Sequence, residues 1–155
     1  MRTQAALKSD VLMTPLLALI ALAAASFMAG VLWVIQIVHY PLLGAVPDAS
    51  IARVALRHQS LITRVVGPTM TVEVISSLLL LLIVPQSLSI MALVPFVLLL
   101  IAVGVTIFQA VPLHSRIAQG TPHLIPRLIQ INWTRTIAWS LRIPCGALIV
   151  YQTLN

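Results

Sequence analysis

The sequence predicts an all-α, multi-pass integral membrane protein: an up-down four-helix bundle with a short interfacial helix between its first and second spans. Charged residues make up only 8% of the chain, whereas a soluble domain carries about a quarter. Mean hydropathy is +1.07. Between Arg64 and Arg116, Glu73 is the only charged residue, so this stretch has room for two spans of about 20 residues each. These observations exclude an ordinary soluble domain.

Four apolar runs, separated by breaks that contain proline, predict the spans of a single domain that covers residues 1–155. The spans are expected at about 12–41, 63–84, 90–112 and 128–151. The first run continues almost unbroken from Val11 to Val38, which is too long for a typical signal peptide, so we expect it to be retained. A tight turn, "PQSLS", joins the second and third spans. The longer connections, 42–62 and 113–127, lie together at the opposite end, which we call the polar end.

The connection 42–62 contains the predicted interfacial helix. In "PDASIARVALRHQS" either Asp48 or Ser50 can cap a helix. Its apolar and basic side chains fall on different faces, Ile51, Val54 and Ala55 on one and Arg53 and Arg57 on another. This pattern is typical of an amphipathic helix in the plane of a membrane surface. A solvated loop is the alternative.

The net charge of +6 comes from nine Lys and Arg against three acidic residues. The basic residues flank or enter apolar segments, so the predicted partners are membrane lipids and a lipophilic small molecule, and nucleic acid is excluded. Arg2 and Lys8 lie at one end of the predicted bundle, and four arginines lie at the polar end: Arg53, Arg57, Arg116 and Arg127. The positive-inside rule therefore predicts a cytoplasmic polar end and both termini outside. The expected location is a bacterial inner membrane. The single Cys145 excludes an intrachain disulfide.

Each predicted span contributes polar side chains, most of them in the half of the bilayer next to the polar end. In chain order they are Gln36, His39 and Tyr40; His58, Arg64, Thr69 and Glu73; Thr106, Gln109 and His114; and Asn132, Arg135, Thr136, Trp139 and Arg142. Polar groups at membrane depth almost always face the protein interior or a wet cavity. We therefore expect a ligand or substrate pocket near the polar end. A purely structural polar core that holds the helices together is the alternative.

The arginines of the last span need partners, because an arginine in hydrocarbon costs roughly 2.5–3.5 kcal/mol on insertion scales. Glu73 is the only carboxylate within the predicted spans. A rise of about 1.5 Å per residue puts Glu73 and Arg142 at nearly the same depth. We therefore predict a structural ion pair between Glu73 and Arg142, with Arg135 as the alternative partner. The arginine left over is bound by amides or by an anionic ligand, and is a candidate functional group.

Two segments, "TIFQAVPLHSRIAQG" and "INWTRTIAWSLR", resemble the anthrone-oxygenase-like family of small four-helix membrane proteins, many of unknown function. The family has a helix that closes on Val-Pro-Leu-Asn and a basic residue, then a final helix with Trp, Asn and Arg. The matching residues are Val111, Pro112, Leu113, Arg116, Asn132, Trp133 and Arg135. The segment "FMAGVLWVIQIVHYPLL" resembles the family's first helix, and His114 stands where the family usually has Asn. The resemblance implies insertion of oxygen into an activated aromatic ring without an obvious cofactor.

The first functional hypothesis is an oxidoreductase or oxygenase that acts on a lipophilic aromatic or quinone-like substrate. His39 or His114 would be the general base, Arg135 would stabilise an oxyanion, and Asn132 would orient the substrate. Further candidate substrate-binding residues are Gln36, Tyr40, Arg64, Gln109 and Trp139.

Two other hypotheses stay open. The chain can be a haem or metal protein that uses two of His39, His58 and His114 as ligands from separate helices, since it has no metal-binding spacing within one helix. It can also be a non-catalytic protein: a lipid-binding protein, a homo-oligomer, or an accessory subunit of a larger membrane complex. The expected cofactor is accordingly either none or a haem or metal bound through histidines.

Overall fold

The computed structural model describes residues 4–154, with side chains from residue 12 onward. Arg2 and the side chain of Lys8, which the orientation argument uses, lie outside this part. Helices and short turns account for every described residue, and no strand occurs in residues 4–154. The predicted all-helical class is therefore confirmed.

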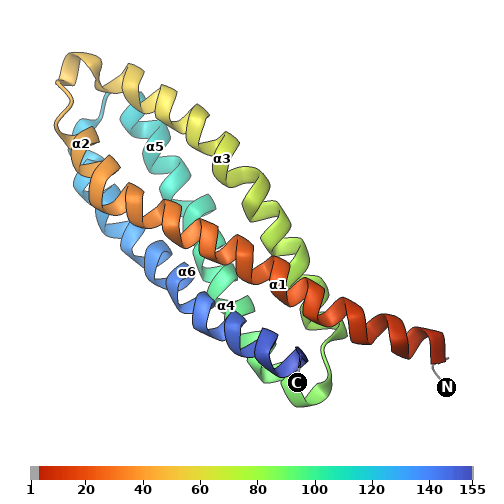
Figure 1. Cartoon of the computed structure of the whole chain (residues 1–155). Helices are drawn as coiled ribbons and strands as arrows, with labels where there is room; N and C mark the ends of the chain where they lie inside the picture. The colour runs from red at the N-terminus through yellow and green to blue at the C-terminus, as the bar shows by residue number, and fades with distance from the viewer. Residues whose placement is uncertain (1–3, 155) are drawn as a thin grey trace.

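The helices follow one another with short turns. In chain order they are α1 (Gln4–Val34), η1 (Ile35–His39), α2 (Tyr40–Gly44), α3 (Asp48–Ile83), η2 (Gln86–Leu88), α4 (Ser89–Val105), η3 (Thr106–Ala110), α5 (Val111–Ala118), η4 (Pro122–Leu124) and α6 (Ile125–Leu154). α1 packs against both α3 and α6, and α4 packs against α6. The two chain termini and η2 lie at one end of the molecule, and α2 lies at the other (Figure 1).

Two π-helical turns, η1 and η3, interrupt otherwise continuous α-helices just before a proline. The amide of Tyr40 donates to the carbonyl of Ile35, and the amide of Val111 donates to the carbonyl of Thr106. The next residue in each case is a proline, Pro41 in α2 and Pro112 in α5, which cannot donate a helical hydrogen bond. A π turn holds more residues than an α turn, so it changes which side chains point inward.

Three stretches of the described chain are long and apolar enough to cross a membrane: Leu12–Gly44, Asp48–Ile83 and Gln86–Ala118. They contain the predicted spans 12–41 and 90–112 and all but the last residue of the predicted span 63–84. The predicted span 128–151 lies in α6, which is 30 residues long but is not among these stretches. Its middle carries Asn132, Arg135 and Arg142, side chains that lower the hydropathy of the helix.

The separate interfacial helix predicted between residues 42 and 62 is wrong. Residues from Asp48 onward form one continuous helix, α3, which begins after Pro47 and makes no side-chain capping hydrogen bond at its start. Ile51 and Ala55 are fully buried in the main hydrophobic cluster, while Arg53 and Arg57 are exposed. The apolar face therefore packs on the protein itself.

Compared with a soluble protein, this chain exposes large apolar side chains and buries charged ones. Phe108 is 78% exposed and Ile90 73%, whereas Glu73 is 0% exposed and Arg142 3%. Small residues on α1, among them Ala18 and Ala25, are buried and allow its neighbours to approach closely. The interior thus holds the polar groups that need partners.

Candidate functional site

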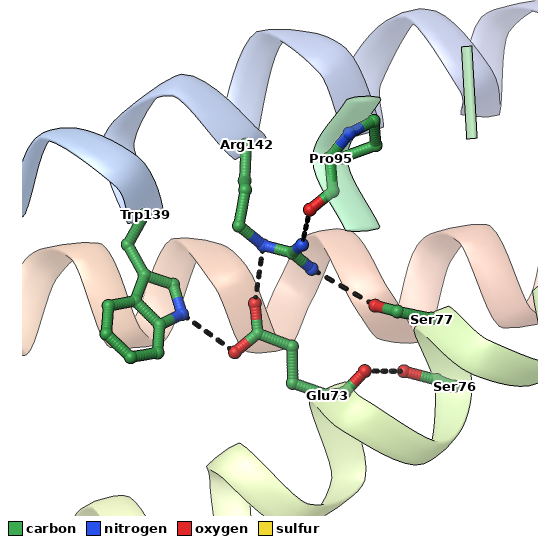
Figure 2. A network of polar contacts seen from close by, with 6 residues as sticks. All are labelled: Glu73, Ser76, Ser77, Pro95, Trp139 and Arg142. Carbon is green, nitrogen blue, oxygen red and sulfur yellow. Dashed lines mark hydrogen bonds and ion pairs between the residues drawn. The ribbon is translucent and has the colours of Figure 1, made fainter. Parts of the chain in front are cut away.

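Two layers of polar side chains are buried in the protein. The layer farther from the polar end, which we call the lower layer, joins α3, α4 and α6. Nε of Arg142 lies 2.9 Å from Oε1 of Glu73, so the predicted contact between these residues is present. Figure 2 shows the two side chains pointing toward each other from α6 and α3. Nε1 of Trp139 donates to the other carboxylate oxygen, Oε2, at 2.8 Å. Each oxygen of the buried carboxylate therefore accepts a hydrogen bond.

The guanidinium of Arg142 is also satisfied on every nitrogen. Its Nη1 donates to the carbonyl oxygen of Pro95 in α4, and its Nη2 donates to Oγ of Ser77 at 3.1 Å. Because a buried ion pair stabilises a fold only when its remaining groups are satisfied, this layer has the features of a structural ion pair.

Trp139→Phe is expected to destabilise the fold by about 1–3 kcal/mol, because one oxygen of the buried Glu73 carboxylate loses its donor. Trp33→Phe is a matched control. Its Nε1 donates to Ser140 Oγ at 3.0 Å, so its loss leaves a neutral hydroxyl, and not a buried carboxylate, without a donor. Thermal unfolding in detergent would compare the two variants, and equal losses would contradict the assigned role of the Trp139 N–H.

The upper polar layer is centred on Arg135, which is 5% exposed. Its Nε donates to Oγ1 of Thr106 at 2.9 Å, and its Nη1 donates to Oδ1 of Asn132 at 3.0 Å. Asn132 in turn donates to Oε1 of Gln36 at 2.7 Å. No carboxylate pairs with Arg135 among the side chains from residue 12 onward. This buried cation is therefore held by neutral oxygens, and it is free to attract an anion.

Three histidines gather beside Arg135, around Tyr40. The hydroxyl of Tyr40 lies 3.0 Å from Nε2 of His114. His39 and His58 stack with ring centroids 4.0 Å apart, and His58 lies 5.3 Å from His114. Within the described part of the chain, Nε2 of His39, Nε2 of His58 and Nδ1 of His114 are buried without a hydrogen-bond partner. Unpartnered buried nitrogens are costly, which makes this cluster a candidate ligand site.

Two spaces adjoin the histidines. An inner cavity of about 60 Å³ is lined by five apolar residues, Ile35 and Ile62 among them, and by five polar ones: Tyr40, His58, Thr106, His114 and Arg135. A groove of about 590 Å³ between α1 and α3 ends at His39 and His58. His58 borders both spaces. At the polar end a further groove is lined by Tyr40, Asp48 and His123, among others.

Most of the predicted site residues come together, but three of them lie elsewhere. Gln109 and Arg64 are exposed and do not line the inner cavity. Gln109 points outward because it lies in the π turn η3, where residues three apart no longer share a face. Arg64 is nine residues from Glu73, which at about 100° per residue puts it on the opposite side of α3. Trp139 belongs to the lower layer and presents its ring to Arg135, whose Cζ is 5.9 Å from the ring centroid.

The residues that line the inner cavity also differ from those predicted. His39 lines the outer groove and not the inner cavity. Gln36 and Asn132 support Arg135 through hydrogen bonds and do not line the cavity themselves. Two contributors were not predicted as site residues: Thr106, which accepts from Arg135, and Ser77, which accepts from Arg142. Hydroxyls at membrane depth are a weak sequence signal, because they commonly bond to their own helix, as Thr106 does to Ala102.

His39 and His58 are not arranged like the two axial ligands of a haem. In the part of the chain with described side chains, no group of three or more His, Cys, Asp or Glu residues is placed to hold a metal. His39 and His58 meet ring face to ring face, with 23° between their planes. Axial haem ligands instead direct a ring nitrogen at the iron. The open nitrogens suit a hydrogen-bonding ligand better.

No protein-family model, curated protein or solved structure matches this chain. The resemblance of its motifs to the anthrone-oxygenase-like family therefore stays a prediction. Within that motif the structure buries Asn132 and Arg135, whereas Trp133 is exposed and packs edge-to-face on Trp33, with ring centroids 5.6 Å apart.

Proposed function

We propose that the chain is a multi-pass membrane protein, an up-down four-helix bundle in which α6 is the fourth span. The three apolar stretches, the exposed apolar exterior and the buried ionic interior support this. α6 tolerates its arginines because they face the other helices, with their charged groups bonded inside the protein. All four arginines counted at the polar end are exposed, as the positive-inside rule requires of a cytoplasmic end.

This topology predicts which single cysteines react from the same side. In a Cys145→Ala background, Ala45→Cys and Gln119→Cys should react with an impermeant maleimide only in inverted bacterial inner-membrane vesicles, because they lie at the polar end. Gln86→Cys and Gln152→Cys should react only in vesicles of the native orientation. Labelling of Ala45→Cys and Gln119→Cys from opposite sides would exclude an even number of spans between them.

We propose further that the histidine–arginine site binds a lipophilic hydroxyaromatic or quinone-like molecule and oxidises it. One observation carries this proposal. The cation of Arg135, which has no carboxylate partner among the side chains from residue 12 onward, lines the same small cavity as an imidazole whose nitrogen has no partner among those side chains. A cation beside a base is the arrangement that removes a proton and then stabilises the oxyanion it leaves.

The volumes of the two spaces determine which part of the substrate each of them can hold. A cavity of about 150 Å³ is known to hold benzene, so the inner cavity of about 60 Å³ takes a hydroxyl or carbonyl oxygen, or dioxygen, but not a ring. The ring lies at the end of the α1–α3 groove, against His39 and His58. Its oxygen reaches past His58 toward Arg135.

The chemistry follows from the family resemblance and from these positions. With Nε2–H of His114 donating to Tyr40, its Nδ1 is free to take a proton from the oxygen that enters the inner cavity, the hydroxyl of the enol form of an anthrone-like substrate. The substrate becomes an enolate whose oxygen Arg135 stabilises, and Asn132 and Thr106 hold the guanidinium in place. The enolate then gives electrons to dioxygen. Overall the methylene carbon loses two hydrogens and gains one oxygen atom, and the second oxygen atom leaves as water.

The experiment uses the detergent-purified protein with anthrone under air. Oxygen uptake and quinone absorbance are recorded together, and we expect equal molar amounts of oxygen consumed and quinone formed. Gln109→Ala, an exposed change on η3, should keep the wild-type rate, and His114→Gln should lower it. A wild-type rate no greater than that of detergent alone would reject the catalytic proposal.

Non-catalytic lipid binding is the second candidate, because the outer groove of about 590 Å³ is far larger than the inner cavity. It predicts that a bound hydrophobic molecule co-purifies with the protein and is found by mass spectrometry of an organic extract. It also predicts that anthrone binds without being oxidised.

A further inference from the structure

The groove between α1 and α3 is long and mostly apolar. Along α1 and η1 it runs from Ser26 to His39, a distance of about 20 Å at 1.5 Å per residue. Its walls are apolar apart from Ser26 at one end and His39 and His58 at the other. Its shape is therefore that of a site for a chain, with polar groups only where the chain would end.

The histidine end of this groove continues into the inner cavity. Ile35, His58 and Ile62 line both spaces. The Nε2 atoms of His39 and His58 are buried there without a hydrogen-bond partner in the described part of the chain, and they can bond to a polar head group. A molecule in the groove thus has its head at the site of the proposed chemistry and its chain along α1.

We propose that the groove binds the apolar tail of the substrate, which is a hydroxyaromatic or quinol head carrying one long hydrocarbon chain. This inference rests on the proposed function for the identity of the head. The tail extends from the histidines toward Ser26 and Phe27, and the substrate enters sideways from the bilayer between α1 and α3. A compact aromatic without a tail would leave most of the groove unfilled.

Gly30 allows the groove to be blocked without disturbing the fold. It lines the groove, and a Cβ placed on it meets no atom within 4 Å. Leucine at this position therefore projects into the groove. Gly104 on α4 is the matched control, because a Cβ there also meets nothing within 4 Å and Gly104 does not line the groove.

The test uses two phenols on the purified protein in lipid nanodiscs: a long-chain 4-alkylphenol whose tail ends in a diazirine, and 4-methylphenol. After irradiation we expect the label on the α1 peptide that contains Ser26 and Phe27. Gly30→Leu should weaken binding of the long-chain probe by about tenfold or more, since each buried methylene contributes to affinity. It should leave 4-methylphenol binding unchanged, and Gly104→Leu should bind both probes like the wild type.

Equal labelling of wild type and Gly30→Leu, or labels spread over the outer faces of all helices, would overturn the groove assignment. So would displacement of the probe by phospholipid alone. The proposed function fails separately: 4-methylphenol binding that does not change in Arg135→Gln would reject the head-group site, while specific labelling at Ser26 and Phe27 would still support a groove for a tail.

Discussion

Glu73→Gln and Arg142→Gln are each expected to destabilise the protein by about 3–5 kcal/mol, the cost of leaving one charge of a buried pair without its partner. The two groups are 0% and 3% exposed and 2.9 Å apart. Hydrocarbon outside the proposed bundle offers no water to take over the lost interaction. Either single change therefore leaves an uncompensated charge among neutral groups.

The double variant, Glu73→Gln with Arg142→Gln, is expected to be less destabilised than the sum of the two single variants. Two neutral amides can bond to each other and to Trp139 and Ser77, and no charge remains buried. Reversible unfolding in mixed micelles gives the four free energies of a double-mutant cycle. Arg64→Gln, on the exposed side of α3, is the control and should change the free energy of unfolding little.

Strict additivity of the two single changes would show that Glu73 and Arg142 do not interact. A second informative result comes from Ser77→Ala, which removes one neutral acceptor of Arg142. Its loss should be well below that of Glu73→Gln, because Arg142 keeps its counter-charge and the carbonyl of Pro95.

The ion pair between Glu73 and Arg142 could be predicted from the sequence, because few charged residues lie at the same depth in the predicted spans. Glu73 is the only carboxylate within the predicted spans, and the rise per residue fixes its level against Arg142. The buried polar face of α6 could also be predicted from the sequence. Its residues are all buried: Asn132, Arg135, Thr136, Trp139 and Arg142. A regular α-helix keeps residues at those spacings on one face.

Side-chain direction in the π turns was not predictable from a regular helical period. Spacing by three suggested that Thr106 and Gln109 share a face, but in η3 Thr106 and Ala110 are buried and Gln109 is exposed. In η1 the same widening buries Gln36 and leaves His39 half-buried toward the outer groove. Pro41 and Pro112 were visible signals, yet a proline does not reveal whether the helix kinks or forms a π turn.

The sequence predicts which side of α3 faces the interior within the span 63–84, but for earlier residues the prediction depends on α3 being one continuous helix. Arg64 and Glu73 are half a turn out of phase at about 100° per residue, which excludes Arg64 from the interior. Both residues lie in the predicted span 63–84, so their relative phase follows from that span alone. The phase of His58 requires residues 48–83 to be one helix, as the structure shows, and a separate interfacial helix before residue 63 would have left it undetermined.

Arg135→Gln is expected to lower the rate of the proposed oxidation by about 10²–10³-fold, the effect of removing one preorganised oxyanion-stabilising group. It should weaken binding of an anionic head group more than binding of a neutral one. Arg135→Lys keeps the charge but loses the fork that bonds to Thr106 and Asn132 together, so an intermediate rate is expected. Oxygen uptake with anthrone measures all three proteins, and Arg64→Gln should match the wild type.

The stability of Arg135→Gln separates a functional arginine from a structural one. Arg142 has a carboxylate partner, so its removal leaves Glu73 charged and buried. Arg135 bonds to Thr106 and Asn132, both neutral, so its removal leaves no charge behind and also relieves the cost of a buried cation. Arg135→Gln should therefore unfold at a free energy close to that of the wild type while losing activity. If it were as unstable as Arg142→Gln, and bound the head group normally, Arg135 would be part of the structural core, and the unpaired cation would not be the feature that attracts a substrate.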